Sequence, residues 1–205
     1  MKERIIQVQN ERVDDIPLLV HMLQEMGVAE IMDELTPRHG NRVGLSHGET
    51  ATVWLAYILS ESDHRMSFME RWAEGRINML QGAMAKVVCV KDLSDDRLGD
   101  VLKVLSDDAR WEAMGNAFNQ RHLHVYELPN DTVRIDATSV AMYHESEGSV
   151  LIAHGHSKDH RPDLAQVKVL FASMAPQAYP LVTEIVPGNG TDAPSTSPLS
   201  NGCEA

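Results

Sequence analysis

The residue that best suits a chemical role is a carboxylate in the middle of a β-like segment. Asp136 stands between Ile135 and Ala137 in the alternating run 132–140. A carboxylate inside a strand costs free energy unless it is solvated, paired or bound to a metal. Many nucleases use an inward strand Asp to bind a hard divalent cation. From the spacing alone, a solvated Asp136 beside Arg134 explains the pattern more simply.

A second group of polar side chains fills residues 154–163. His154, His156, His160, Asp159 and Asp163 lie within ten residues, a composition that suits a transition-metal site. The run also holds Lys158 and Arg161, whose charges suit phosphate. A His-x-His pair is a weak signal by itself. A solvated loop between two strands remains the simplest interpretation of these residues.

The composition of the chain limits the classes of protein to which these side chains can belong. The chain has 205 residues, 43% of them hydrophobic, and a net charge of -12 from 30 acidic and 18 basic residues. This is room for one large domain or two small ones. The acidic balance argues against binding nucleic acid through bulk charge. Cys89 and Cys203 are too far apart in sequence to indicate a disulfide scaffold, and no apolar run is long enough to span a bilayer. We expect a cytoplasmic protein with no membrane partner.

The first 128 residues have the apolar period of helices. The pattern predicts helices over about 16–26, 28–35, 46–59, 67–80, 94–105 and 107–121. Ser46 and Glu49 form the sequence pattern of a capping box. Behind it, Leu55, Ile58 and Leu59 are predicted to share a core face, which Val53, Trp54 and Tyr57 widen.

The period changes near residue 130. Three strands are predicted over about 132–140, 166–174 and 179–187. Val133, Ile135 and Ala137 take one face of the first strand, and Arg134, Asp136 and Thr138 take the other. Residues 191–205 have almost no apolar content and are expected to be disordered.

Three segments of the β region carry a family resemblance. Residues 134–140, 155–168 and 187–189 resemble bacterial and archaeal insertion-sequence transposases of the DDE class, which have a ribonuclease-H-like catalytic core. The long middle segment is the most specific of the three. Residues 13–72 resemble the uncharacterised helical domain that commonly heads these proteins. The resemblance covers about residues 5–192.

The resemblance implies an α+β fold and a set of functional residues. Residues 1–128 would form a helical domain of unknown function that binds DNA ends or dimerises, and 129–190 would form the first three strands of the ribonuclease-H-like core. Asp136 matches the first catalytic, metal-binding acid, and two Mg²⁺ or Mn²⁺ ions are expected in the intact family. Lys158, Arg161 and Lys168 are the candidates for DNA or phosphate contact. The partners would be transposon-end DNA, a second copy, or a full-length transposase.

The same resemblance shows where this chain departs from the family. The second acid lies downstream of the Gly-Asn turn, and the final Glu lies further on, so both are missing here. Reading the codons of the tail two bases late permits a family-like sequence, so we expect a truncated chain with a frameshifted tail at 191–205. Such a chain would be inactive alone. The alternatives are a non-catalytic module that regulates an intact transposase and a metal hydrolase built on His154, His156 and Asp159.

Overall fold

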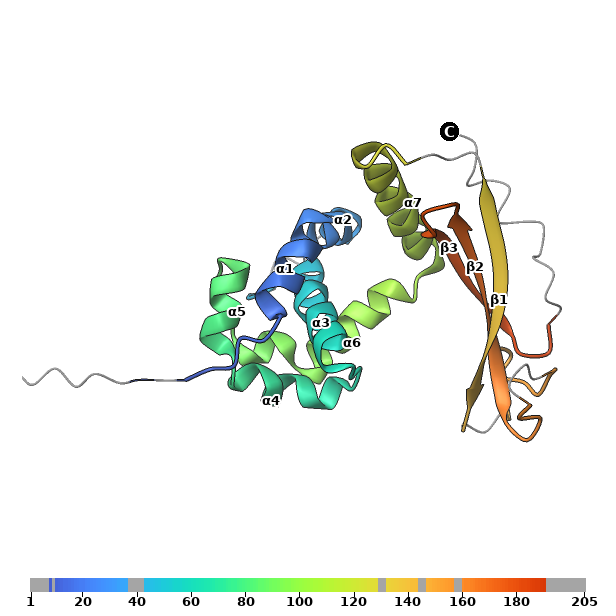
Figure 1. The fold of residues 1–205 in the computed structure, drawn as a ribbon. Coiled ribbons are helices and arrows are strands. Elements are labelled where there is room, and N and C mark those ends of the chain that lie inside the picture. The colour runs from blue at the N-terminus through green and yellow to red at the C-terminus, as the bar shows by residue number, and fades with distance from the viewer. Residues whose placement is uncertain are drawn as a thin grey trace, which may run out of the picture. The chain divides into compact units, whose positions relative to one another are not determined.

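The computed structural model describes residues 8, 10–36, 43–128, 132–143, 147–156 and 160–190. The chain divides into two compact units, Met1–Phe118 and Asn119–Ala205, here called the helical unit and the sheet unit. In the described residues, seven α-helices precede a three-stranded antiparallel sheet, as Figure 1 shows. The predicted α+β class is therefore confirmed. No helix among the described residues is long and apolar enough to cross a membrane.

The helical unit is built from short helices and two 3-10 turns. They are α1 (Ile16–Glu25), α2 (Val28–Leu35), α3 (His47–Glu61), η1 (Met66–Phe68), α4 (Met69–Glu74), α5 (Ile77–Met84), η2 (Val90–Leu93), α6 (Asp95–Leu105) and the first part of α7 (Asp108–Val125).

The start of α3 is fixed by the predicted capping box. The Glu49 amide donates to Ser46 Oγ at 3.1 Å, and the Ser46 amide donates to Glu49 Oε2 at 2.8 Å. These two bonds satisfy amides that a helix start otherwise leaves without partners. The Glu49 carboxylate also accepts from Lys86 Nζ at 2.6 Å. One residue therefore ties the start of α3 to the chain that follows α5.

The core of the helical unit forms around α3, which packs against α1, α2 and α6 (Figure 1). Val53, Ala56 and Tyr57 are almost completely buried. Of the predicted core face, Val53, Trp54 and Tyr57 are confirmed as buried, and Ile58 packs half-buried against the core. Leu55 and Leu59 are exposed, Leu59 by 58%, so their assignment to this face was wrong. Because α3 is surrounded on most sides, its small and β-branched residues face neighbouring helices. The two leucines occupy the side that α1, α2 and α6 leave uncovered.

The predicted single helix over 67–80 is broken into η1, α4 and α5. The break falls at Gly75 and Arg76, and Arg76 has φ -142° and ψ 15°. This backbone conformation is not helical. Arg76 instead turns inward and is buried among acidic and aromatic side chains. Periodicity alone does not reveal a break that is stabilised by a distant ion pair.

The sheet unit holds β1 (Val133–Met142), β2 (Ala165–Met174) and β3 (Tyr179–Pro187) in the order β1-β2-β3. Both pairs are antiparallel, with Asp136 opposite Phe171 and Phe171 opposite Thr183. The three predicted strands are confirmed within one or two residues at each end. The last part of α7 contacts the start of β3 in this unit. Asn119 Nδ2 donates to the Leu181 carbonyl oxygen at 2.8 Å.

Candidate functional site

Asp136 lies on β1 with its side chain exposed to solvent. Its Oδ1 accepts a hydrogen bond from the next backbone amide, that of Ala137, at 2.8 Å. No Lys or Arg of the described residues forms an ion pair with it. Solvation therefore removes the cost that a buried strand carboxylate would carry. The carboxylate keeps lone pairs available for a cation.

Asp136 is not part of a ligand cluster in the portion of the sheet unit that the structure describes. Within the described part of the chain, no group of three His, Cys, Asp or Glu side chains is placed to hold a metal ion. The nearest charged residue in sequence on the same face is Arg134. Of the metal site predicted from the sequence, the described residues therefore contain one exposed carboxylate, that of Asp136, on a regular strand.

The cationic candidates have different environments. Arg161 forms two hydrogen bonds with Asp163, at 2.8 and 2.7 Å. The bond to Asp163, with a further one to Tyr143, raises the pKa of Arg161. Lys168 is only 5% exposed, and its ammonium donates to the Gly190 carbonyl oxygen at 2.5 Å. A phosphate contact by Lys168 would require this buried hydrogen bond to break. Lys158 lies outside the described residues.

The most specific sequence motif forms a tightly packed backbone junction. Gln166 is 1% exposed, and its Nε2 donates to the carbonyl oxygens of His156 and Gly188, each at 3.0 Å. Ala153 and Gln166 exchange backbone hydrogen bonds of 3.1 and 3.0 Å. A Cβ at Gly155 would lie 2.1 Å from the Gly188 oxygen. The two glycines are therefore required by close backbone approach.

This junction changes the interpretation of the motif 155–168. Gln166 joins the Ala153–His156 segment, β2 and the turn after β3 through one buried amide. A buried side-chain amide needs several such partners to offset its desolvation. Sequence reasoning missed Gln166 because it stands at the start of an apolar run. The signal that would have found it is the pair of glycines on either side of a strand Gln.

The histidines of the polar run lie in the same unit. His154 and His156 follow the bridge residue Ala153, and His160 has a positive φ of 57°. His154 lies close enough to Asp163 to contribute to the lowering of that carboxyl's pKa, after the larger effect of Arg161. Asp159, which the metal-hydrolase alternative requires, lies outside the described residues.

The helical unit contains a buried charge network that the sequence did not reveal. Arg76 donates to Asp14 at 3.2 Å and to Glu61 at 3.0 Å, and Trp72 Nε1 donates to the same Glu61 oxygen at 2.9 Å. Hydrogen bonds from Arg12 and Arg76 lower the pKa of Asp14 against the opposing effect of burial. The network joins four separate segments of the unit. Its buried cation and paired carboxylates are typical of a structural ion cluster.

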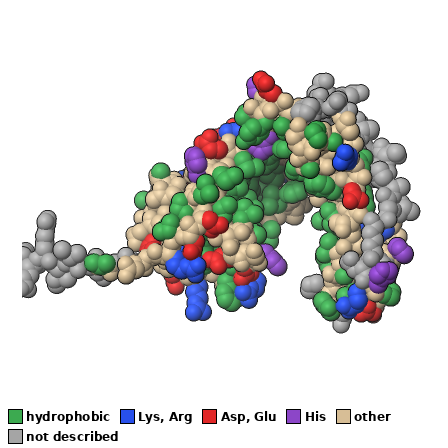
Figure 2. Space-filling model, viewed as in Figure 1, with side chains coloured by type: hydrophobic (Ala, Val, Ile, Leu, Met, Phe, Trp, Pro, Cys, Tyr) green, Lys and Arg blue, Asp and Glu red, His purple; other side chains and the backbone are tan. Residues whose placement is uncertain are grey.

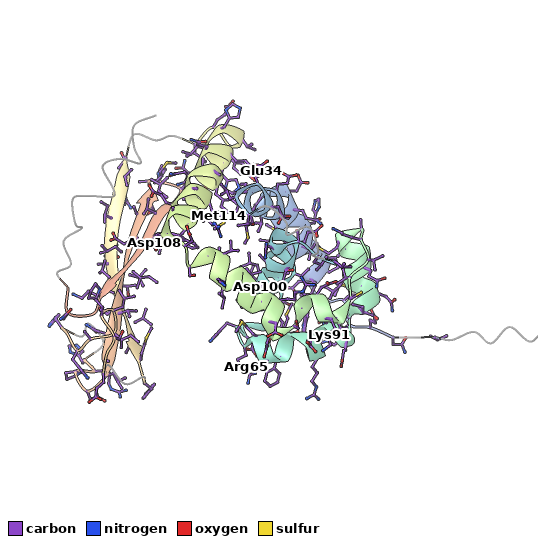
Figure 3. All side chains as sticks on the ribbon, turned by 180° about the vertical axis from the view of Figure 1, so that it is seen from behind. Glu34, Arg65, Lys91, Asp100, Asp108 and Met114 are labelled. Atoms are coloured by element: carbon purple, nitrogen blue, oxygen red, sulfur yellow. The ribbon has the colours of Figure 1, made fainter. Side chains whose placement is uncertain are left out.

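The surface of the helical unit carries mixed charge. On the face shown in Figure 2, Lys and Arg side chains are scattered among acidic ones and form no continuous patch of the coloured residues. One polar hollow is lined by Ser67, Glu70, Lys91, Ser94, Asp95 and Asp96. Lys91, labelled in Figure 3, pairs with Glu70 at 3.1 Å. These features resemble an ordinary solvated surface more than a nucleic-acid interface.

These observations define an α+β protein with a helical unit and a small antiparallel sheet that carries one exposed strand carboxylate. A family model described as a domain of unknown function (DUF4277) matches residues 8–113, just over half of the chain. The chain therefore belongs to this family. The matched residues all lie within the helical unit. No curated protein and no solved structure matches the chain.

Proposed function

We propose that this chain is derived from a DDE-class insertion-sequence transposase and that its sheet unit corresponds to the start of the metal-dependent core. The observation that carries the proposal is the position of Asp136. It is an exposed carboxylate near the middle of the first strand of an antiparallel β1-β2-β3 sheet. Carboxylate oxygens are the ligands that Mg²⁺ and Mn²⁺ prefer. The match to a domain of unknown function is evidence neither for nor against this proposal.

Residue geometry limits what the chain does by itself. Two-ion phosphoryl transfer uses several ligands to clamp two cations about 4 Å apart. Asp136 offers one carboxylate, and Asp163 is occupied by Arg161. We therefore expect this chain alone neither to cleave nor to join DNA ends with Mg²⁺ or Mn²⁺. Two-ion catalysis at Asp136 would require further acidic ligands beside it.

The experiment that tests the proposal follows paramagnetic broadening by Mn²⁺ in the NMR spectrum of the ¹⁵N-labelled full chain. Broadening is expected at amides around Asp136 on β1 and at Phe171 on β2, its cross-strand neighbour. Asp136→Asn should abolish it, because an amide oxygen is a much weaker ligand than a carboxylate. The matched control is Asp163→Asn, which removes an exposed carboxylate from the same unit and should leave broadening at β1 unchanged.

Other patterns of broadening would contradict the proposal. Broadening confined to the amides of His154, His156 and Asp159 would favour the metal-hydrolase alternative. Broadening that survives Asp136→Asn would remove Asp136 from the site.

DNA binding is tested separately by fluorescence anisotropy with a labelled duplex. Because the chain carries a net charge of -12, we expect weak affinity that falls steeply as salt rises. Arg161→Ala should reduce the slope of log affinity against log salt by about 1 if this side chain contacts one phosphate. A slope unchanged by Arg161→Ala would remove that residue from the list of DNA contacts.

A further inference from the structure

The helical unit exposes two short rows of apolar side chains on neighbouring helices. Leu18 and Met22 lie one turn apart on α1 and are 61% and 53% exposed. Leu55 and Leu59 lie one turn apart on α3 and are 37% and 58% exposed. Residues four apart in a helix share a face, so each pair forms a continuous row. Both helices bury other faces in the core, so these two rows contribute little to folding.

The two rows belong to helices that contact each other directly. α1 packs against α3, and Ser60 Oγ donates to the Asp15 carboxylate where the start of α1 meets the end of α3. Ser60 follows Leu59 in α3, and Asp15 comes about one turn before Leu18. Figure 2 shows hydrophobic side chains gathered over α1 and α3 on the face that it presents. The four side chains of Leu18, Met22, Leu55 and Leu59 are here called the α1–α3 strip.

The shape of the α1–α3 strip suits a helix as its binding partner. The largest apolar patches on soluble monomers reach about 300 to 600 Å² and often mark interaction sites. Rows of side chains on two packed helices accept the apolar ridge of a third helix between them. Helices recognised in this way carry apolar side chains at i, i+3 or i+4, and i+7, which matches the one-turn spacing of both rows.

The charge around the strip selects the kind of helix. The helices α1, α2 and α3 contain no Lys or Arg. They contain six acidic residues, which are Glu25, Glu30, Asp33, Glu34, Glu49 and Glu61. Lys86, from the chain after α5, pairs with Glu49. Arg76, from the turn before α5, pairs with Glu61. These two cations are fewer than the six acids, so the three helices attract a basic partner and repel an acidic one.

We propose that the α1–α3 strip binds an amphipathic helix of a partner protein whose apolar face is flanked by Lys and Arg. The strip covers the apolar face of that helix, and the acidic residues of α1, α2 and α3 attract its basic flanks. A second copy of this chain does not fit, because its own strip is carried by the same acidic helices and the two surfaces would repel. The proposal concerns the helical unit and does not depend on Asp136 or on transposase ancestry.

Fluorescence anisotropy with a synthetic peptide tests the proposal on the full chain. The probe is a labelled helix of about four turns with Leu on one face and Lys on the other, and its matched control has Glu in place of every Lys. We expect the Leu/Lys peptide to bind with a dissociation constant below about 100 μM, weakening as salt rises. The Leu/Glu peptide should bind at least about tenfold more weakly. Equal affinity for the two peptides, or no binding of either, would overturn the proposal.

Substitutions inside and outside the strip locate the binding surface. Leu59→Ser should weaken binding of the Leu/Lys peptide by about tenfold, because the peptide then covers a polar side chain instead of an apolar one. The residue is exposed, so the thermal midpoint and the circular dichroism should stay close to those of the wild type. The matched control is Leu151→Ser, which changes a leucine of the sheet unit that is 44% exposed and should leave binding unchanged. A similar effect of both substitutions, or no effect of Leu59→Ser, would overturn the proposal.

Sedimentation velocity of the chain alone separates a partner helix from a second copy. We expect no concentration-dependent association that Leu59→Ser removes. A dimer that Leu59→Ser abolishes and Leu151→Ser leaves intact would show that a second copy occupies the α1–α3 strip, and it would overturn the proposal.

Discussion

Replacing Gly48 with alanine should force α2 away from α3. A Cβ on Gly48 would lie 2.3 Å from the Ala29 carbonyl oxygen and 2.6 Å from Ala29 Cα. Ordinary carbon–oxygen contacts are about 3.3 to 3.6 Å, so α2 must shift by roughly 1 Å. That shift also strains the bond from the Gly48 amide to Asp33 Oδ1, which is 2.9 Å long.

The cost follows from what α2 buries. Its side chains Val28, Ile31 and Met32 lie in the core, each contributing about 1.5 to 3 kcal/mol when fully buried. A gap of 0.5 to 1 Å forfeits about a quarter to a half of the contact energy. Alanine recovers up to about 1 kcal/mol through its higher helix propensity. Half of the contact energy of these three side chains, less the gain in helix propensity, gives a net loss of about 1 to 4 kcal/mol.

The assay is urea unfolding followed by tryptophan emission. All three tryptophans lie in the helical unit, so emission reports this unit separately from the sheet unit. The matched control is Gly99→Ala in α6, where a Cβ meets no atom within 4 Å. This control should stabilise by about 0.5 to 1 kcal/mol. If Gly48→Ala and Gly99→Ala change the unfolding free energy alike, the inferred contact between α2 and α3 is wrong.

Three further outcomes test other parts of the structure. Gly188→Ala would place a Cβ 2.0 Å from the Gln166 carbonyl oxygen, so amide hydrogen exchange at Gln166 should accelerate; unchanged exchange would argue against the junction. Burial opposes ionisation of Glu49, but hydrogen bonds from Lys86 and Ser46 outweigh it and lower its pKa below 4.5. The stability that Glu49 contributes is therefore present above pH 4.5 and lost as pH falls through the lower folded-state pKa. Glu49→Gln should make the urea-unfolding midpoint depend less on pH in that range. Ala85→Gly should raise the midpoint of thermal unfolding, because Ala85 has φ 49° at the end of α5. In this left-handed conformation any residue other than glycine costs about 1 kcal/mol. An unchanged or lower midpoint would contradict this prediction.

Local patterns predicted much of the fold. The capping box at Ser46 and Glu49 marks the start of α3 because its two hydrogen bonds involve residues only three apart. The strands were recognisable because alternation over eight or more residues is unlike a helical period. What local patterns did not reveal depends on residues distant in sequence. The break at Arg76 is held by Asp14 and Glu61, and no local pattern reports that contact.

The candidate site was predictable only as a set of residue types. Asp136 was found because a carboxylate in a strand is uncommon, yet its exposure depends on which side of the sheet is covered. Lys168 carried the charge of a phosphate ligand, but its burial follows from the turn at Gly190, which the sequence does not place beside it. Periodicity assigns a side chain to a face and does not say whether that face is covered.

The contacts of the segment before α1 determine where a stable fragment of this protein must begin. The Glu11 carboxylate accepts from the amides of Asn78 and Met79 at the start of α5, at 3.2 and 2.8 Å. Burial opposes ionisation of Glu11, but these bonds outweigh it and lower the pKa. A fragment cut at Ile16 would retain every helix and still lose this cap, together with one of the two carboxylates that neutralise buried Arg76. The smallest independently stable piece of the helical unit should therefore start ahead of Glu11, several residues before its first helical turn.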